Sequence, residues 1–280
     1  MFIKEKSILL IIVAAMLACS CSGGKMEGKE LEFDSILGVP EAQWKKLAEE
    51  RVYFGHQSVG YNIIEGITDI IKKNPQVKLN IVQTDDPTKF GTPLFAHSPV
   101  GANGDPKSKV DEFVKFMDRG LGNQVALAFM KFCYVDFTAS TDVEKVFQDY
   151  RKTFSALKEK YPKITFIHVT APLTAPLSLK DRLKQIIKKI IGRPTASIED
   201  NIKRSQFNNK MRKEYEGKEP LFDLARIEST YRDGTQALFE KDGKTYPHLV
   251  GAYTRDGGHL NEMGRKVVAE QLLVFLANLS

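Results

Sequence analysis

The sequence predicts an α/β fold of three layers, with a mostly parallel five-stranded sheet between two layers of helices. Short apolar runs alternate with amphipathic helical segments along the chain, and no internal repeat or second linker interrupts them. Alternation of this kind gives parallel strands joined by helical crossovers. With 280 residues, 42% hydrophobic and 27% charged, the chain suits one domain with a substantial core and is unlike a disordered or fibrous protein.

Five apolar runs have the length and the β-branched or aromatic content of strands. The run over 125–135 is almost continuously apolar, which indicates a buried central strand. The others alternate or are shorter, and they end at glycine, proline or polar residues. The predicted strands are 51–55, 77–83, 125–135, 164–170 and 221–227.

Three segments show the apolar spacing of helices. The first begins at or just after Ser58, where Val59, Ile63 and Ile67 follow one another by about one turn. The second covers 143–160, and the last covers 262–279. In a parallel sheet the ligand crevice lies outside the carboxyl ends of the strands, so the residues that directly follow each strand are the candidates for chemistry.

The first residues predict export and lipid attachment. Lys4 and Lys6 precede an apolar run over 7–18 that is short for a bilayer span and is typical of a signal peptide. Met16-Leu17-Ala18-Cys19 resembles a bacterial lipobox, in which the cysteine carries lipid; an ordinary secretory signal is the alternative. We expect a signal peptide (1–18), a lipidated tether (19–34) and one domain (35–280), anchored to the bacterial cell envelope at the outer membrane or periplasmic face.

The net charge of +6 is mild, and no zinc-finger spacing or basic repeat accompanies it, so we expect no nucleic-acid partner. The main charge feature is the segment 177–193, which holds six basic residues and one acidic residue beside an apolar helical face. A surface helix is the simplest interpretation. A lid, a contact with anionic lipid headgroups and a grip on acidic polysaccharide are the alternatives.

Ser58 follows the first predicted strand, in Gly55-His56-Gln57-Ser58-Val59-Gly60. A serine at a strand-to-helix turn exposes its hydroxyl and places its own N–H at the positive end of the helix. Both features suit a nucleophile that must stabilise an oxyanion. A helix N-cap is the competing interpretation of this serine.

Asp256 and His259 lie three residues apart in a glycine-rich turn before the last helix. A catalytic imidazole needs an acceptor that fixes its tautomer, so that its other nitrogen can take the serine proton. Alone, the turn could also be a helix start or a metal site.

Together, Ser58 near the start and Asp256-x-x-His259-Leu260 before the final helix resemble the SGNH, or GDSL-type, hydrolases over about residues 50–280. The resemblance implies a flavodoxin-like fold and no metal or other cofactor. It also implies that Ser58 attacks an ester carbonyl, that His259 moves the proton and that Asp256 orients His259. The Ser58 N–H would be one oxyanion donor.

The sequence departs from the family's pattern at the other oxyanion donors. The aspartate that normally precedes the serine is replaced by Gln57, and the asparagine expected after the third strand is absent. The N–H of Gly101 or of Gly104 is the candidate for the second donor. For the missing asparagine, the side chain of Asn103 or that of Lys131 takes its place, or the hole is built from two donors. Losing one such donor typically costs about 2.7–4 kcal/mol of transition-state stabilisation, so a weak or unusual esterase is one expectation.

Other residues are candidates for substrate contact or for packing. His56, Gln57, Lys131 and Glu228 are the candidates for substrate contact at the crevice, with a structural hydrogen bond as the alternative for His56. Cys133 is expected to be buried packing, and no histidine or cysteine spacing indicates zinc.

We expect a serine esterase that removes a small acyl group, acetyl above all, from an O-acylated carbohydrate. The family and the export signal favour this substrate. A lipid-ester hydrolase is the alternative among enzymes, and an inactive carbohydrate-binding lipoprotein is the alternative outside them. The sequence does not define the oligomeric state.

Overall fold

A computed structural model describes residues 33–176 and 197–280. The predicted signal peptide, Cys19 and the basic segment 177–193 lie outside the described residues. Within those two ranges, no helix combines the length and the apolar character that a membrane crossing requires.

The described residues form an α/β fold, as predicted, around a sheet in which all neighbouring strands pair in parallel. The strand order is β2-β3-β1-β4-β5-β6. Two further strands, β7 and β8, form a separate antiparallel hairpin. The strands are β1 (Arg51–His56), β2 (Ile81–Gln83), β3 (Leu94–Pro99), β4 (Leu127–Met130), β5 (Thr165–Val169), β6 (Leu221–Phe222), β7 (Leu238–Lys241) and β8 (Lys244–Pro247).

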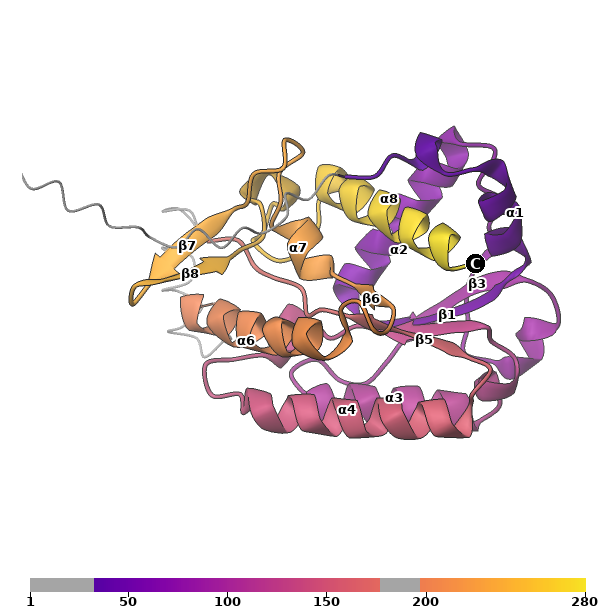
Figure 1. Ribbon diagram of the computed structural model, residues 1–280, viewed down its shortest axis with the longest axis horizontal. Helices are drawn as coiled ribbons and strands as arrows, with labels where there is room; N and C mark the ends of the chain where they lie inside the picture. Colours follow the sequence, from indigo (N-terminus) through magenta and orange to yellow (C-terminus); the bar gives the residue numbers. More distant parts are fainter. Residues whose placement is uncertain (1–32, 177–196) are drawn as a thin grey trace, which may run out of the picture. The chain divides into compact units, whose positions relative to one another are not determined.

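Helices cover both faces of the sheet (Figure 1). One face packs against α1, α2, α7 and α8, and the other against α3, α4 and α6. Alternate residues of β1 serve the two cores, because successive strand side chains point to opposite faces: Phe54 packs with the α2–α8 side and Tyr53 with the α3–α4 side. The helices are α1 (Glu41–Glu49), α2 (Ser58–Lys73), α3 (Pro106–Asp118), α4 (Val143–Lys160), α6 (Ile198–Tyr215), α7 (Leu224–Glu228) and α8 (Glu262–Leu279).

The prediction of five strands is corrected to six. The missed strand is β3, which lies between β2 and β1 and carries the mixed sequence LFAHSP. Its polar His97 and Ser98 interrupt the apolar pattern, yet both are buried because each finds a hydrogen-bond partner, His56 and Tyr53 respectively. Because β3 is buried on both faces yet contains polar residues, its sequence shows neither an alternating pattern nor a continuous apolar run, and it gave no strand signal.

Several predicted strands are shorter than expected. The apolar run over 125–135 contributes only Leu127–Met130 to β4 and then turns into a short 3-10 helix, Tyr134–Asp136. The run over 221–227 contributes two residues to β6 before α7 begins. Asp223 causes this change, because its side chain accepts from the backbone N–H of Arg226 and caps the helix.

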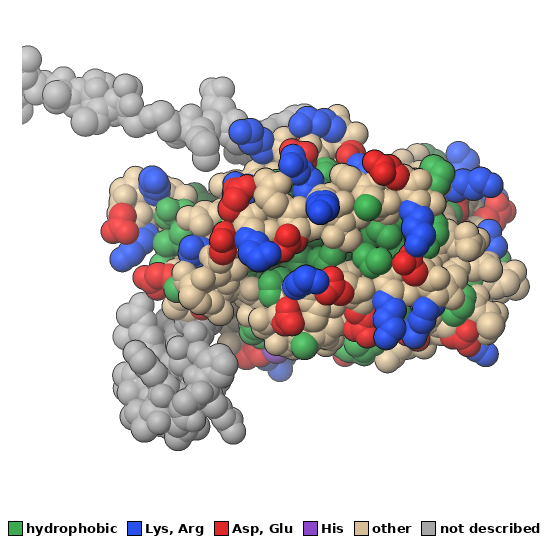
Figure 2. All heavy atoms as spheres, turned by 90° about the horizontal axis from the view of Figure 1, so that it is seen from below, with side chains coloured by type: hydrophobic (Ala, Val, Ile, Leu, Met, Phe, Trp, Pro, Cys, Tyr) green, Lys and Arg blue, Asp and Glu red, His purple; other side chains and the backbone are tan. Residues whose placement is uncertain are grey.

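The surface over α3 and α4 carries both signs of charge. Figure 2 shows basic and acidic side chains intermingled on this face. Pairs one helical turn apart account for part of the pattern, with Lys107 beside Asp111 on α3 and Lys145 beside Asp149 on α4. On the described part of this face the positive charges are therefore balanced locally rather than gathered.

Candidate active site

Ser58 is the first residue of α2 and lies at the carboxyl end of β1. In the sheet, β1 lies between β3 and β4: the chain adds β2 and β3 on one side of β1 and then β4, β5 and β6 on the other. The strand order therefore reverses at β1, and α/β folds bind ligands beside the carboxyl end of such a strand. Gly60 makes the turn possible: a Cβ there would lie 2.2 Å from the His56 ring. Gln57 provides no side-chain cap for the helix, which leaves the first N–H groups of α2 without that partner.

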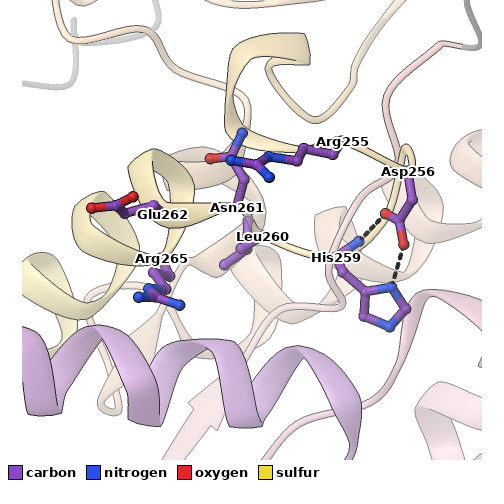
Figure 3. A pocket seen from close by; sticks show the side chains of 7 residues that line it. All are labelled: Arg255, Asp256, His259, Leu260, Asn261, Glu262 and Arg265. Carbon is purple, nitrogen blue, oxygen red and sulfur yellow. Dashed lines mark hydrogen bonds and ion pairs between the residues drawn. The ribbon is translucent and has the colours of Figure 1, made fainter.

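Asp256 and His259 form a hydrogen-bonded pair in the loop before α8. His259 Nδ1 lies 2.7 Å from Asp256 Oδ2, and the His259 N–H donates to Asp256 Oδ1 (Figure 3). The N–H of Gly258 donates to the same Oδ1. Burial pushes the pKa of Asp256 upward, but the hydrogen bonds from His259 and Gly258 outweigh it and lower the pKa to about 2. A carboxylate at this position makes Nδ1 the protonated nitrogen of a neutral imidazole and leaves Nε2 as a proton acceptor.

A hydrogen bond joins the His259 loop to the helix of Ser58. The N–H of Leu260 donates to Asn62 Oδ1 at 3.2 Å, and Asn62 is one helical turn after Ser58. The N–H of Ala175 also donates to the carbonyl of Gly257, at 2.8 Å. Among the described residues, Ser58 and His259 share no direct hydrogen bond, and catalytic bonds are often long in the absence of substrate.

A pocket of about 360 Å³ opens beside His259. Figure 3 shows the imidazole and the Asp256 carboxylate at one side of it, with Arg255 and Asn261 further along the loop. Leu260 is the one apolar residue in the lining. The other lining residues are polar or charged: Arg255, Asp256, His259, Asn261, Glu262 and Arg265.

The glycine donors proposed for the oxyanion hole are already occupied. The N–H of Gly101 donates to the carboxylate of Glu112, and the N–H of Gly104 donates to Asp136 Oδ1 at 2.9 Å. This geometry goes against the expectation that either glycine offers a free N–H to a substrate. Glu112 lies one helix further along the chain and Asp136 lies beyond β4, so the sequence around the glycines gave no sign of either partner.

The two side-chain candidates lie in different surroundings. Asn103 is exposed, and its Oδ1 accepts from Lys109 Nζ at 3.2 Å. Lys131 is buried, with its Nζ donating to the carbonyl of Phe132 at 3.2 Å. Cys133 is buried and free, as expected for packing.

His56 and Gln57 make structural hydrogen bonds at the Ser58 turn, in place of the expected contact with substrate. His56 is fully buried, and its Nε2 lies 3.0 Å from Nδ1 of His97. Burial, with the nearby Lys131 charge as the next cause, lowers the pKa of His56 to about 3. Gln57 Nε2 donates to the carbonyls of Val100 and Gly101, at 3.0 and 2.7 Å, and so ties the turn to the following loop.

The expectation that Glu228 follows a strand and faces the crevice is wrong. It lies at the end of α7 and is fully buried, with Oε2 accepting from the N–H of Leu173 at 2.8 Å. Its Oε1 has no hydrogen-bond partner among the described residues. Burial raises the pKa of Glu228 to about 8, against the lowering effect of the Leu173 hydrogen bond and of Lys131.

Two residues at the site were missed by sequence reasoning. Asn62 looked like an ordinary helix position, and Tyr134 lay inside a run interpreted as strand. Tyr134 places its hydroxyl 3.5 Å from His259 Nε2. The only available sequence signal for Asn62 was its place one turn after the serine, and the sequence held no signal for Tyr134. No group of three or more histidine, cysteine or acidic side chains able to hold a metal occurs within 33–176 and 197–280.

Comparison with known proteins places the chain in a family. The sequence profile of the GDSL-like lipase/acylhydrolase family matches residues 67–272, a span that includes Asp256 and His259 and begins after Ser58. A search of curated proteins found no match.

Solved structures of low sequence identity resemble the chain. A protein from Streptococcus pneumonia described as a platelet activating factor is 14% identical, with a TM-score of 0.48 over 86% of this chain and 94% of that one. A G-D-S-L family lipolytic protein from Desulfitobacterium hafniense DCB-2 is 10% identical, with a TM-score of 0.42 over 80% and 97%. The periplasmic domain of a Salmonella ser. Paratyphi A lipopolysaccharide acetyltransferase is 11% identical, with a TM-score of 0.44 over 88% and 90%.

The family match covers well over half of the sequence and confirms the resemblance that the motifs predicted. The chain belongs to the GDSL-like lipase/acylhydrolase family.

Proposed function

We propose that this protein is a serine esterase in which Ser58, His259 and Asp256 act together to remove a small acyl group, acetyl above all. The observation that carries the proposal is the Asp256–His259 pair. It leaves Nε2 as the acceptor, in a loop bonded through Leu260 to the helix that Ser58 begins. Membership of an acylhydrolase family supports the same chemistry.

In the proposed reaction, Ser58 Oγ attacks the ester carbonyl while His259 Nε2 takes its proton. The carbonyl π pair moves to oxygen, and the Ser58 N–H at the start of α2 donates to that oxyanion. His259 then gives the proton to the leaving alcohol as the carbon–oxygen bond breaks. Water repeats the sequence on the acyl-enzyme and releases the acid, and Asp256 keeps the imidazole in one tautomer throughout.

We propose an O-acylated carbohydrate as the substrate. The surroundings of His259 support it, because six of the seven residues that line the adjacent pocket have polar or charged side chains, which can hydrogen-bond to the hydroxyl groups of an alcohol. The expected export signal also favours this substrate, because an exported protein would meet carbohydrates outside the cytoplasm. We also propose lipid attachment at Cys19, which incorporation of labelled palmitate into the protein, but not into a Cys19→Ala variant, would test.

The test of the activity is hydrolysis of p-nitrophenyl acetate and of longer acyl homologues by the purified protein and by Ser58→Ala. We expect turnover that favours acetate and disappears in the variant. A preference for long acyl chains would favour a lipid-ester hydrolase. A folded protein without turnover, and without acetate release from acetylated polysaccharides, would favour the binding protein.

A further inference from the structure

A tyrosine lies where the family pattern leads one to expect an asparagine donor. Tyr134 follows β4, and β4 pairs with β1, so the turn that holds Tyr134 is a neighbour of the turn that holds Ser58. The N–H of Lys131 donates to the carbonyl of Gly55 at 3.1 Å and continues this pairing beyond the strand. The side chain of Tyr134 is therefore delivered to the same edge of the sheet as the proposed nucleophile.

The Tyr134 ring packs against the proposed base. Its centroid lies 5.6 Å from that of His259 at an interplanar angle of 78°, and its hydroxyl oxygen lies 3.5 Å from His259 Nε2. Gly258 leaves room for the ring, since a Cβ there would lie 2.6 Å from Tyr134 Cζ. The hydroxyl is thus next to the nitrogen that must exchange a proton with Ser58 and with the leaving group.

The backbone on either side of Tyr134 is held by buried polar groups. Arg204, which is 1% exposed, donates from Nη1 to the Tyr134 carbonyl at 2.6 Å. Asp136 Oδ2 accepts from the N–H of Cys133 at 2.6 Å, and Asp136 itself is paired with the buried Lys109. A donor fixed in this way needs little reorganisation during a reaction, which is what makes preorganised donors effective.

The hydroxyl keeps its proton at any pH where the protein would work. Burial, and next the nearby negative charge of Asp256, raises the pKa of Tyr134 to about 12. The group is therefore a hydrogen-bond donor rather than an acid or a nucleophile. Rotation about the Cζ–Oη bond moves only the hydrogen, so the donor can turn from His259 Nε2 to a substrate oxygen without displacing the ring.

Resting on the proposed esterase function, we propose that Tyr134 is a catalytic residue whose hydroxyl donates a hydrogen bond to the ester carbonyl oxygen as Ser58 attacks. In that step the Ser58 proton passes to His259 Nε2 and the carbonyl π pair moves to oxygen. Tyr134 binds this oxyanion but transfers no proton to it. The tyrosine takes the place of the missing asparagine, beside the N–H of Ser58.

The test compares Tyr134→Phe with the unaltered protein on p-nitrophenyl acetate and on an alkyl acetate. We expect kcat to fall on the order of 10²–10³-fold on both esters, the typical effect of removing one oxyanion donor. KM should stay nearly constant, since the interaction forms only in the transition state. The matched control is Tyr161→Phe, which removes a hydroxyl that donates to Asp118 at the surface and should leave kcat unchanged.

Three results would overturn the proposal: an unchanged kcat in Tyr134→Phe, a change confined to KM, or a loss confined to the alkyl acetate. The last would place the hydroxyl at the leaving oxygen instead. Failure of the esterase function is distinguishable, because the unaltered protein would then show no turnover and mass spectrometry would detect no acyl adduct on Ser58. Far-ultraviolet circular dichroism and thermal unfolding of both variants would separate a folding defect from a catalytic one.

Discussion

Asn62 Oδ1 accepts a hydrogen bond from the N–H of Leu260 at 3.2 Å, although the two residues are far apart in the sequence. Through this bond, the loop with Asp256 and His259 is held against the helix that begins with Ser58. The candidate site therefore depends on a contact between α2 and the loop before α8, and these two helices are also the most extensively packed pair among the described helices.

Replacing Asn62 with alanine should impair activity more than stability. The lost hydrogen bond is worth about 0.5–1.5 kcal/mol of unfolding free energy, while a displacement of about 1 Å between reacting groups can cost about 10²-fold in rate. Ester hydrolysis and urea unfolding of Asn62→Ala measure the two effects. Asn80→Ala, at an exposed position before β2, should alter neither. Equal activity in both variants would mean that the bond does not position the loop.

Asp256→Asn should reduce kcat by about 10³–10⁴-fold, because an amide can no longer hold the His259 tautomer that a carboxylate selects. The loss should be present at all pH values above about 2, the lowered pKa of Asp256, since the carboxylate is ionised throughout that range. The measurement is a pH–rate profile of both proteins over the working range, roughly pH 5 to 9. A variant that regains full activity at any pH in the window would contradict the assigned role.

Gly60→Ala should destabilise the Ser58 turn. The new Cβ would lie 2.2 Å from the His56 ring, and that ring is enclosed by Phe54, Tyr61 and His97. Overpacking of this kind costs about 1–3 kcal/mol, and we expect a loss of ester hydrolysis with it. The control is Gly38→Ala, where a Cβ meets nothing within 4 Å. Equal denaturant midpoints for the two variants would show that the His56 ring moves aside for the new Cβ without loss of stability.

Lys109→Met should lower the unfolding free energy by about 3–5 kcal/mol, because Asp136 would remain as a buried charge without its cation. Both side chains are fully buried, at 2.6 Å from each other. Lys145→Met removes a lysine from a pair that is largely exposed and should cost less than about 1 kcal/mol. Chemical unfolding of the two variants provides the comparison, and similar losses would contradict the buried-pair argument.

Glu228 should make the protein less stable as the pH rises toward 8. Its folded-state pKa is raised to about 8 from 4.5, so between these values the folded state binds more protons than the unfolded state, and stability falls with rising pH. The buried His56, His97 and His168 have lowered pKa values, of about 3, 4 and 4, and give the opposite slope below 6.5.

The contribution of Glu228 should therefore be resolved between about pH 7.5 and 8, where these histidines, whose ordinary pKa is 6.5, are almost entirely neutral in the unfolded state as well as in the folded state. Urea unfolding across that window should show a falling stability in the unaltered protein and a flatter dependence in Glu228→Gln, which keeps an acceptor for the N–H of Leu173. Identical slopes in the two proteins would rule out the raised pKa.

The sequence by itself determined the fold class, the helices with a clear apolar period and the residues proposed for the triad. The helix over 143–160 and the closing helix over 262–279 match α4 and α8, because a one-sided or continuous apolar pattern needs only local spacing to be recognised. The family followed from Ser58 near the start and Asp256 with His259 near the end, a pattern of short motifs that needs no geometry.

Only the tertiary structure decided which polar groups are free. The N–H groups of Gly101 and Gly104 are taken by carboxylates of Glu112 and Asp136, and Glu228 is buried rather than open to a crevice. The strand β3 and the position of Tyr134 against His259 also arise from contacts between distant segments. Hydrogen bonds and burial between segments far apart in the chain depend on packing, and a sequence pattern records only the spacing of residues along it.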